Sequence, residues 1–475
     1  MLVMKFGGTS VECAESIARV TRIVHDRLHL QPVVVVSALA RVTDQLHAMG
    51  SLSREGRRDE ALQTLAAIEA RHCEVASQLL PARCRELFER CLQPAFEEAR
   101  SLLRAIAAIS ELTPRTLDRL LGFGERWSSC LASEAFKAHG LPAVFVDSCD
   151  VVITDSNYSH AAPLTGEINS RVQSKIVPLL NAGSVPVVGG FIGATLDGIP
   201  TTLGRGGSDF TASIIGASLE ADCIEIWTDV DGMMTADPSI CPEAQNIEAI
   251  SFEEAAELAH FGAKVLHPKT LQPTVEKGIP VYVLNSRHPE NRGTRVEVGA
   301  GSAAARARSI ALKRGIVLTE VVARQGFDAK LTASIFAALE EQKCLVDLAA
   351  MSRSNLSLLL ASADSAVALA ASLDDLAVVK TTPGVALVSI VGRNVACDPA
   401  ISARALAALP DQTVRMIFHG ASDMNLSFVV EEERAAEVVR LLHEVMFPQE
   451  GSSENLQLVL PQSWQLKDAV AAGEA

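Results

Sequence analysis

A lysine followed by two glycines stands near the start of the chain, in the segment Lys5-Phe-Gly-Gly-Thr-Ser10. Adjacent glycines let a backbone approach a ligand closely and turn its N–H groups toward an anion. The lysine adds a mobile charge, and Ser10 suits the N-cap of a helix predicted over residues 11–28. The spacing is not that of a P-loop, in which the lysine follows the glycines. We therefore predict a phosphate-binding turn; the alternative is an ordinary tight turn.

A second glycine-rich segment, Thr201-Thr-Leu-Gly-Arg-Gly-Gly-Ser-Asp209, follows a predicted hairpin that ends near Thr202. We expect a helix from Phe210, with Ser208 or Asp209 as its cap. Arg205 between glycines is suited to bind a carboxylate or a phosphate through two hydrogen bonds. The alternative is a capped loop in which Asp209 serves only the helix and the arginine is solvated.

Three further segments carry charged residues at positions suited to a site. Thr228 and Asp229 end an apolar run, and ligands of open α/β sheets bind at such strand ends. Glu125, predicted at a helix start, and Lys264, predicted between two helices, could equally serve as partners of helix dipoles. The loop after Asp229 is not an EF-hand, because its fifth and twelfth positions are Met233 and Ile240.

Valine- and isoleucine-rich runs predict the scaffold that positions these residues. Such runs are typical of strands buried on both faces, and hence of a mainly parallel sheet between helices. Residues 55–110 instead predict long helices, broken at Pro81 and near Pro94, inserted between the second and third strands. The predicted strands are 33–36, 143–147, 185–190, 223–229 and 279–284.

The last third of the chain contains an internal repeat beyond a small-residue segment at residues 299–308. The triplet Asn355-Leu-Ser357 recurs as Asn425-Leu-Ser427, and each copy belongs to a predicted β-α-β-β unit. Helices on one face of a small antiparallel sheet predict two ferredoxin-like modules. A helix at 431–446 completes the second unit. The predicted strands are 316–322, 345–350, 356–361, 385–391, 414–418 and 426–430, with helices at 331–342 and 399–409.

Composition excludes several classes of function. The net charge of −15 argues against a nucleic-acid or anionic-membrane surface, because both require basic patches. The ten cysteines form no C-x-x-C pair, and His260 and His267 lack metal-site spacing, so no protein metal site is predicted. The absence of a signal peptide or long apolar run predicts a cytoplasmic protein that uses no membrane.

Six motifs in order resemble those of the aspartate kinases: KFGGTS at 5–10, FGE at 123–125, GGFIG at 189–193, TTLGRGGSD at 201–209, WTDVDG at 227–232 and FGAKVLHP at 261–268. The repeated units resemble the paired ACT domains of that family. The resemblance implies an α/β amino-acid kinase domain, carbamate-kinase-like, followed by two α+β ferredoxin-like ACT domains. The implied boundaries are 1–298 for the kinase domain, 299–314 for a linker, 315–384 and 385–450 for the ACT domains, and 451–475 for a tail that could add one strand at 456–460.

The resemblance further implies ATP-dependent phosphorylation of the side-chain carboxylate of L-aspartate, the first step toward lysine, threonine and methionine. Mg²⁺ would be held mainly by the ATP phosphates. The implied catalytic residues are Lys5, Asp209 and Lys264; the substrate residues are Ser37, Thr43, Glu125, Phe191, Arg205, Gly206, Gly207 and Ser208; the nucleotide residues are Lys5, Phe6, Gly7, Gly8, Thr228, Asp229, Met234, Lys264 and Val265; and the residues for an amino-acid effector, lysine or threonine, are Gln325, Asp328, Val346 and Asp347.

The chain departs from the family pattern where many relatives have tyrosine and arginine, at Met234 and Ser239. Asp44 replaces a common asparagine, and Met351 a usual threonine. Two alternatives therefore stay open: a kinase for another acidic metabolite such as glutamate, and a non-catalytic amino-acid sensor. We expect at least a homodimer, paired through the C-terminal modules.

Overall fold

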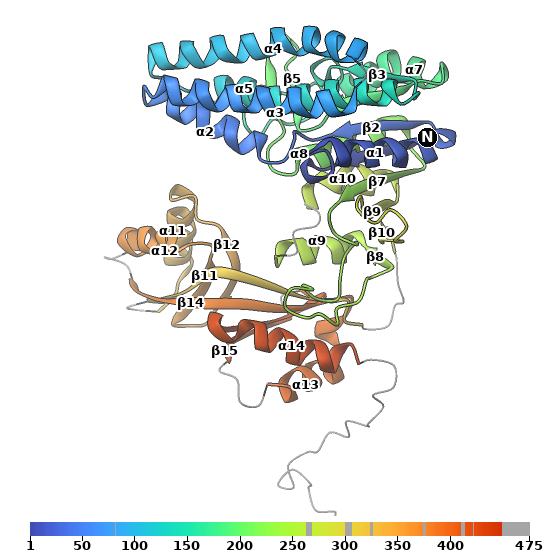
Figure 1. The fold of residues 1–475 in the computed structure, drawn as a ribbon. Coiled ribbons are helices and arrows are strands. Elements are labelled where there is room, and N and C mark those ends of the chain that lie inside the picture. Colours follow the sequence, from blue (N-terminus) through green and yellow to red (C-terminus); the bar gives the residue numbers. More distant parts are fainter. Residues whose placement is uncertain are drawn as a thin grey trace, which may run out of the picture.

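The chain folds into two units, each built on its own sheet, in a computed structural model (Figure 1). The N-terminal unit comprises residues 1–299, and the C-terminal unit comprises residues 306–448. The structure describes residues 1–80, 82–262, 268–299, 306–323, 326–373, 377–409, 414–420 and 422–448. The predicted tail with its strand at 456–460 lies outside the described residues.

The N-terminal unit is organised by an eight-stranded sheet of order β3-β4-β2-β1-β7-β9-β10-β8. Its central strands are parallel, as the buried apolar runs predicted, and β10 alone pairs antiparallel with β9. The strands are β1 Leu2–Phe6, β2 Pro32–Val36, β3 Ala143–Val146, β4 Val185–Gly189, β7 Cys223–Thr228, β8 Ala249–Ser251, β9 Val281–Asn285 and β10 Thr294–Glu297, with a separate hairpin of β5 Ile192–Ala194 and β6 Pro200–Thr202.

Alternate residues of β1 enter two different hydrophobic cores, one on each face of the sheet. Leu2, Met4 and Phe6 pack with helices α1–α5, whereas Val3 packs with α6, α8 and α10. This explains why every position of the strand is apolar except Lys5 at its end. The helices are α1 Ala14–Asp26, α2 Val42–Arg54, α3 Arg58–Leu79, α4 Ala82–Ile109, α5 Pro114–Ala138, α6 Thr165–Arg171, α7 Val177–Asn181, α8 Gly207–Leu219, α9 Phe252–His260 and α10 Pro268–Lys277.

The predicted helical insertion is confirmed between β2 and β3, with one correction. The helix α3 ends at Leu79 and α4 begins at Ala82, while the predicted break at Pro81 lies outside the described residues; α4 runs without interruption through Pro94. A proline inside a long helix removes one hydrogen bond, and neighbouring packing can sustain the helix on either side. Leu92 and Phe96 beside it are buried in the core shared with α5.

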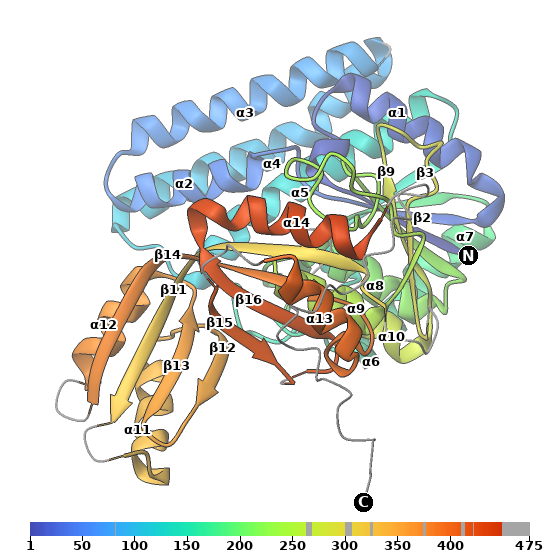
Figure 2. The same cartoon turned by 90° about the horizontal axis from the view of Figure 1, so that it is seen from below.

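The C-terminal unit is a single antiparallel sheet of order β12-β13-β11-β14-β16-β15 that joins both repeats (Figure 2). The recurring triplets begin equivalent strands: Asn355 pairs with Val322, and Asn425 pairs with Val391. The duplication is therefore visible in the topology. The elements are β11 Ser309–Ala323, α11 Ala329–Glu341, β12 Val346–Met351, β13 Asn355–Leu360, α12 Ala363–Leu373, β14 Ala377–Val391, α13 Pro399–Ala407, β15 Val414–His419, β16 Asn425–Glu431 and α14 Ala435–Met446.

Two features of this unit differ from the prediction. The first repeat ends in a helix of its own, α12, so that each unit is β-α-β-β-α. The strands β11 and β14 are also longer than predicted: β11 begins at Ser309, inside the segment expected to be a linker, and β14 runs across position 384 without a break. These long strands pair with each other over both repeats, which fuses the two modules into one sheet.

The helix α9 connects the two units. Leu258 of α9 belongs to the same hydrophobic core as Leu318 and Leu387 of the C-terminal sheet. Glu257 of α9 accepts a hydrogen bond from Asn425, and Thr235 and His443 are joined by a hydrogen bond of 2.9 Å. The C-terminal sheet thus packs its helix-free face against α9, whereas the segment around Thr235 contacts α14. None of the helices in the described ranges combines the length and apolarity that a membrane span requires.

Candidate functional site

The predicted residues gather at the carboxyl edge of the central parallel strands. Lys5 is the penultimate residue of β1, and Thr228 is the last residue of β7. Ser37 follows β2, and Gly190 follows β4. Because parallel strands present their carboxyl ends at one edge, four separate segments meet there.

Lys5 and Asp209 form an ion pair, with Lys5 Nζ 2.7 Å from Asp209 Oδ1. Both side chains are largely buried, at 11% and 13% exposure. The contact brings the two charges together without the alignment of a good hydrogen bond, so that Asp209 Oδ1 has no hydrogen-bond partner among the described residues. The structure thus joins two predicted catalytic residues, one from a central strand and one from the helix that packs against that strand.

The glycine turn after β1 differs from the prediction in its donors. The Gly7 N–H donates to the carbonyl of Trp227 at 3.1 Å and so extends the ladder between β1 and β7; it does not face an anion. Gly8 is required by a close approach, since a Cβ there would lie 2.9 Å from the Ala38 carbonyl oxygen. A short 3₁₀ turn over Gly8–Ser10 follows.

Ser10 is not the cap of the first helix. The helix α1 begins at Ala14 after Cys13, and Ser10 is buried, with its hydroxyl 2.8 Å from that of Ser286. Ser286 also donates to the Thr228 carbonyl, and so ties the end of β9 to the end of β7. Ser286 was missed by the sequence reasoning. Its available signal was the change from apolar to polar residues at Asn285-Ser286, directly after a buried strand.

Ser37 and Ser208 connect the loops after β2 and before α8, with a 3.0 Å hydrogen bond between their hydroxyls. Gly190 makes this contact possible, because a Cβ there would lie 2.6 Å from Ser208 Cβ. Phe191 adopts a left-handed backbone with φ of 65° and donates its N–H to Thr211 Oγ1 at 3.0 Å. Phe191 also closes over Gly207, at which a Cβ would lie 2.7 Å from the phenyl ring. These contacts bring Ser37, Phe191, Gly207 and Ser208 together.

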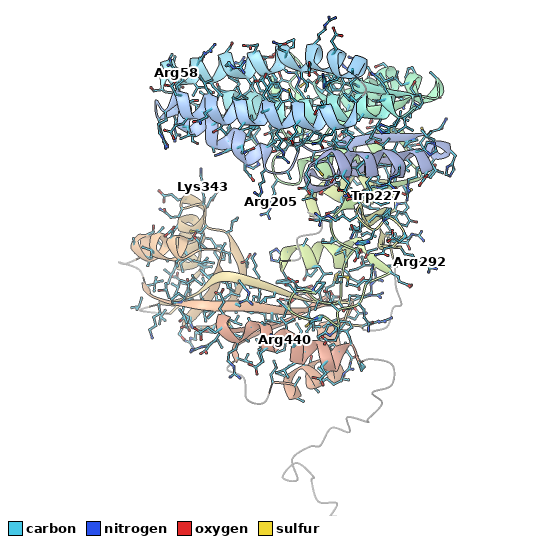
Figure 3. The ribbon with its side chains drawn as sticks, viewed as in Figure 1. Arg58, Arg205, Trp227, Arg292, Lys343 and Arg440 are labelled. Carbon is cyan, nitrogen blue, oxygen red and sulfur yellow. The ribbon has the colours of Figure 1, made fainter. Side chains whose placement is uncertain are left out.

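The helix α8 begins earlier than predicted, at Gly207, with Gly206 in the left-handed conformation as its N-cap. Ser208 and Asp209 therefore lie in its first turn and do not cap it, which releases both side chains for other contacts. Arg205 stands immediately before this helix, exposed (Figure 3). Its guanidinium forms no ion pair with any residue in the described part of the chain. A carboxylate ligand could therefore bind it without displacing a partner.

Glu125 is buried in the interior of α5 rather than at a helix start. One oxygen accepts the N–H of Ala38 at 3.3 Å, and the other, Oε2, has no partner among the described residues. Burial raises the pKa of Glu125 from 4.5 to about 8, against the opposing effect of the Ala38 N–H. A buried carboxylate with one oxygen that lacks a partner is a strong candidate for binding a cationic group.

Thr43 lies in the first turn of α2, which begins at Val42. Gly124 of α5 packs against Ala38 and Val42, so this turn stands next to Glu125. The neighbouring Asp44 is also in the first turn. The structure thus brings Thr43 to the same side of the sheet as Ser37 and Glu125.

The residues predicted for the nucleotide lie on the other side of Lys5. Thr228 donates its hydroxyl to Asp229 at 3.2 Å. Met234 is half-buried, and its carbonyl accepts a hydrogen bond from Ser309 of β11. The Ser239 hydroxyl donates to Asp237 within an exposed turn. Ser239, which stands where many relatives have arginine, therefore forms its hydrogen bond within its own turn. Met234 contacts the C-terminal unit through its carbonyl.

The predicted effector residues have different structural roles. Asp328 is the N-cap of α11 and accepts the Leu331 N–H at 2.7 Å. Val346 begins β12 and packs against the core of the first repeat. Asp347 forms an ion pair of 2.5 Å with Lys313, and its second oxygen, Oδ2, is buried without a partner among the described residues. Lys264, Val265 and Gln325, also predicted as site residues, lie outside the described residues.

The site contains no preformed metal centre in the described ranges, where no three histidine, cysteine, aspartate or glutamate side chains come together. A cavity of about 310 Å³ lies on another face of α5, lined among others by Arg115, Arg119 and Ile192. Its lining includes none of the predicted site residues. The candidate site is therefore defined by the contacts at the strand ends and not by this cavity.

Comparison with known proteins identifies the family of the chain and of its parts. Residues 1–285 match the amino acid kinase family, and residues 388–446 match an ACT domain. The chain is 34% identical to the lysine-sensitive aspartokinase 3 of Escherichia coli, over 94% of this chain and 99% of that protein. It is 33% identical to the chloroplastic aspartokinase 2 of Arabidopsis thaliana, over 94% of this chain and 84% of that protein.

Solved structures give the same result. The structure of E. coli aspartokinase III in complex with aspartate and ADP, in the R-state, is 32% identical and superposes with a TM-score of 0.81, covering 94% of this chain and all of that one. The same enzyme in complex with lysine and aspartate, in the T-state, gives a TM-score of 0.80 and covers 99% of that chain.

Proposed function

The chain belongs to the amino acid kinase family and to its aspartokinases, and from that premise we propose how its residues transfer the γ-phosphoryl group of ATP to the side-chain carboxylate of L-aspartate. The product is 4-phospho-L-aspartate. The ion pair between Lys5 and Asp209 carries the proposal, because it places a mobile cation and an oriented carboxylate where three strand-end loops meet.

Lys5 stabilises the transferring phosphoryl group. The transition state of phosphoryl transfer spreads negative charge over three oxygens, so catalysis depends on positioning and positive charge. Asp209 orients the lysine and leaves it largely buried, where its charge acts through a lower dielectric than in water. No general base is needed, because the attacking carboxylate is ionised at neutral pH. Lys264 is proposed as the second phosphate-facing cation from its place in the FGAKVLHP motif.

Two charged residues bind the α-carboxylate and the α-ammonium of L-aspartate. Arg205 binds the α-carboxylate through its planar fork, and the unpartnered oxygen of Glu125 accepts the α-ammonium. Thr43 and the paired hydroxyls of Ser37 and Ser208 complete the polar surface beside the side-chain carboxylate. The substrate is thereby held with its reactive oxygen directed toward Lys5.

ATP binds across the ends of β1 and β7. The close approach at Gly8 and the residues Thr228 and Asp229 form one wall, and half-buried Met234 packs on the base. An Mg²⁺ ion would be carried mainly on the ATP phosphates. The ion supplies charge neutralisation on those phosphates when it is bound.

An amino-acid effector, lysine or threonine, binds in the first repeat of the C-terminal unit. Asp347 supports this proposal, because its buried Oδ2 lacks a donor that an effector ammonium supplies. His260 at the end of α9 lies 3.3 Å from the Asp347 carbonyl oxygen. Lys264 comes four residues after this histidine, so Asp347 contacts a residue that is near a proposed catalytic lysine in the chain.

The assay that tests the function measures ATP-dependent hydroxamate formation from aspartate and hydroxylamine, with glutamate as the parallel substrate. The account predicts turnover of aspartate and at most trace turnover of glutamate. Equal rates with glutamate would contradict the substrate assignment. The alternative of a non-catalytic sensor, favoured by Met234 and Ser239, predicts lysine or threonine binding by calorimetry with no hydroxamate.

A further inference from the structure

Asp118 of α5 is completely buried, yet its carboxylate serves no proposed step of the reaction. Oδ2 accepts the backbone N–H groups of Ser159 at 2.8 Å and Thr202 at 2.9 Å. Oδ1 accepts the Thr202 hydroxyl at 2.9 Å and the Ser159 hydroxyl at 3.4 Å. All four donors are neutral and come from only two segments. A buried carboxylate is costly, so an arrangement this fully satisfied points to a specific role.

Thr202 is the last residue of β6 and immediately precedes the loop that carries Arg205. The same loop is fixed from its other side, because Gly204 packs so closely that a Cβ would lie 2.7 Å from His160 Nδ1 and 3.1 Å from the Ser159 carbonyl. Asp118 therefore fixes the start of the Arg205 loop from two sides. It accepts a hydrogen bond from Thr202 directly, and it holds the segment packed against Gly204 through Ser159.

The same helix carries Glu125, seven residues further along. Seven residues of α-helix span about 10.5 Å and two turns, so the two side chains project from the same face. One end of α5 thus anchors the loop of Arg205, and its middle supplies the carboxylate proposed for the substrate ammonium. The helix α5 thus sets the distance between Arg205 and Glu125, the residues proposed to bind the α-carboxylate and the α-ammonium of L-aspartate.

We propose that Asp118 is a positioning residue for L-aspartate: it fixes Arg205 relative to Glu125 without touching the substrate. The inference rests on the proposed function. It predicts that a change at Asp118 alters the KM for aspartate far more than the KM for ATP, because the nucleotide residues lie on β1 and β7. A general loss of stability predicts no such difference between the two substrates.

The test compares Asp118→Ala with Asp118→Asn. The alanine leaves four buried donors unsatisfied and frees the loop base, and we expect the KM for aspartate to rise roughly tenfold or more. The asparagine keeps one oxygen for the two N–H groups, and its amide can donate to the two hydroxyls, which rotate to accept. We therefore expect Asp118→Asn to stay within about threefold of the wild-type KM.

Asp155→Ala is the matched control, because Asp155 holds the segment that contains Ser159 through the N–H groups of Asn157 and Ala162 but accepts no hydrogen bond from β6 among the described residues. It should leave both KM values nearly unchanged. If Asp118→Ala does not fold, Thr202→Val removes a single hydroxyl of the network and should still raise the KM for aspartate alone. Equal changes in both KM values, or none in a folded variant, would overturn the inference. An inactive wild-type enzyme would instead refute the proposed function.

Discussion

The Lys5 ammonium lies 2.7 Å from the Asp209 carboxylate, although Lys5 is the penultimate residue of the first strand and Asp209 stands in the first turn of α8. The pair exists because β1 occupies the middle of the sheet and α8 packs against it. The loop after β2 closes the arrangement through Ser37 and Ser208. Positive charge, its orienting partner and a hydroxyl pair thus meet at one edge of the sheet.

Replacing Glu125 by glutamine should raise the KM for aspartate by roughly ten- to a hundredfold, because a hydrogen bond to a charged group is lost. The pKa of Glu125 is about 8 in the empty site, so ammonium binding favours its ionised form and releases a proton. We expect the wild-type KM for aspartate to fall as pH rises from 6 toward 8, and the glutamine variant to lose this dependence. A parallel pH profile in both proteins would contradict the role.

The same residue predicts an effect on stability. Because the folded-state pKa of Glu125 exceeds its ordinary value of 4.5, the folded protein binds the proton more tightly, and the free energy of unfolding falls as pH rises from about 4.5 to 8. Glu125→Gln removes this penalty. Its stability relative to the wild type should therefore increase across that window and level off above pH 8, as measured by chemical denaturation without ligands.

Gly190→Ala should abolish the contact between Ser37 and Ser208. The added Cβ would lie 2.6 Å from Ser208 Cβ and 2.8 Å from its Cα, so α8 must shift. We expect kcat/KM for aspartate to fall roughly a hundredfold, as for other small misplacements of a site. Gly166→Ala is the control, since a Cβ there meets no atom within 4 Å. Activity of Gly190→Ala equal to that of the control would show that the close approach is unimportant.

Glu254 predicts a stability effect where the two units meet. Its buried carboxylate accepts the N–H groups of Ser251 and Arg393 at 3.0 Å each, and Arg308 lies 3.4 Å away. Glu254→Ala leaves these donors without a partner and should cost about 3 kcal/mol in unfolding free energy. The exposed neighbour Glu253 serves as the control, with a change within about 0.5 kcal/mol expected for Glu253→Ala. Similar losses of unfolding free energy in Glu254→Ala and Glu253→Ala would contradict this role of Glu254 where the two units meet.

Asp347→Asn should weaken effector binding, measured by calorimetry with lysine and with threonine. The substitution replaces the carboxylate, whose buried Oδ2 lacks a donor, by a neutral amide. It therefore removes the negative charge that would pair with the effector ammonium. Asp328→Ser keeps the cap of α11 but removes the second carboxylate implied for the effector, and so tests that residue separately. If Asp328→Ser alone loses binding, the effector group lies at the start of α11 instead.

Local sequence patterns predicted the scaffold well because buried parallel strands are recognisable from apolar runs alone. The strands at 33–36 and 223–229 and the hairpin ending near Thr202 are all present. Helix starts were harder to predict. Serine is a residue type that often caps helices, but α1 and α8 are capped by other residues, and the hydroxyls of Ser10 and Ser208 form tertiary contacts.

Contacts between distant segments could not be predicted from composition. The Gly7 N–H appeared free for an anion until its partner, the Trp227 carbonyl, was placed beside it by strand pairing. Glu125 was expected at a helix start, and only the packing of α5 against the loop of Ala38 shows why it is buried and why its pKa is raised. Asp118 carries no local motif, because its four donors lie far away in the sequence.

The central claim is tested most directly by hydroxamate formation from aspartate in the wild type and in Asp209→Asn, at saturating ATP. The account predicts steady turnover by the wild type and a loss in kcat of roughly a hundredfold or more in the variant, whose Lys5 is no longer oriented. Aspartate binding by calorimetry should persist in the variant. A variant with unchanged kcat, or a wild type with no aspartate-dependent product, would contradict the account.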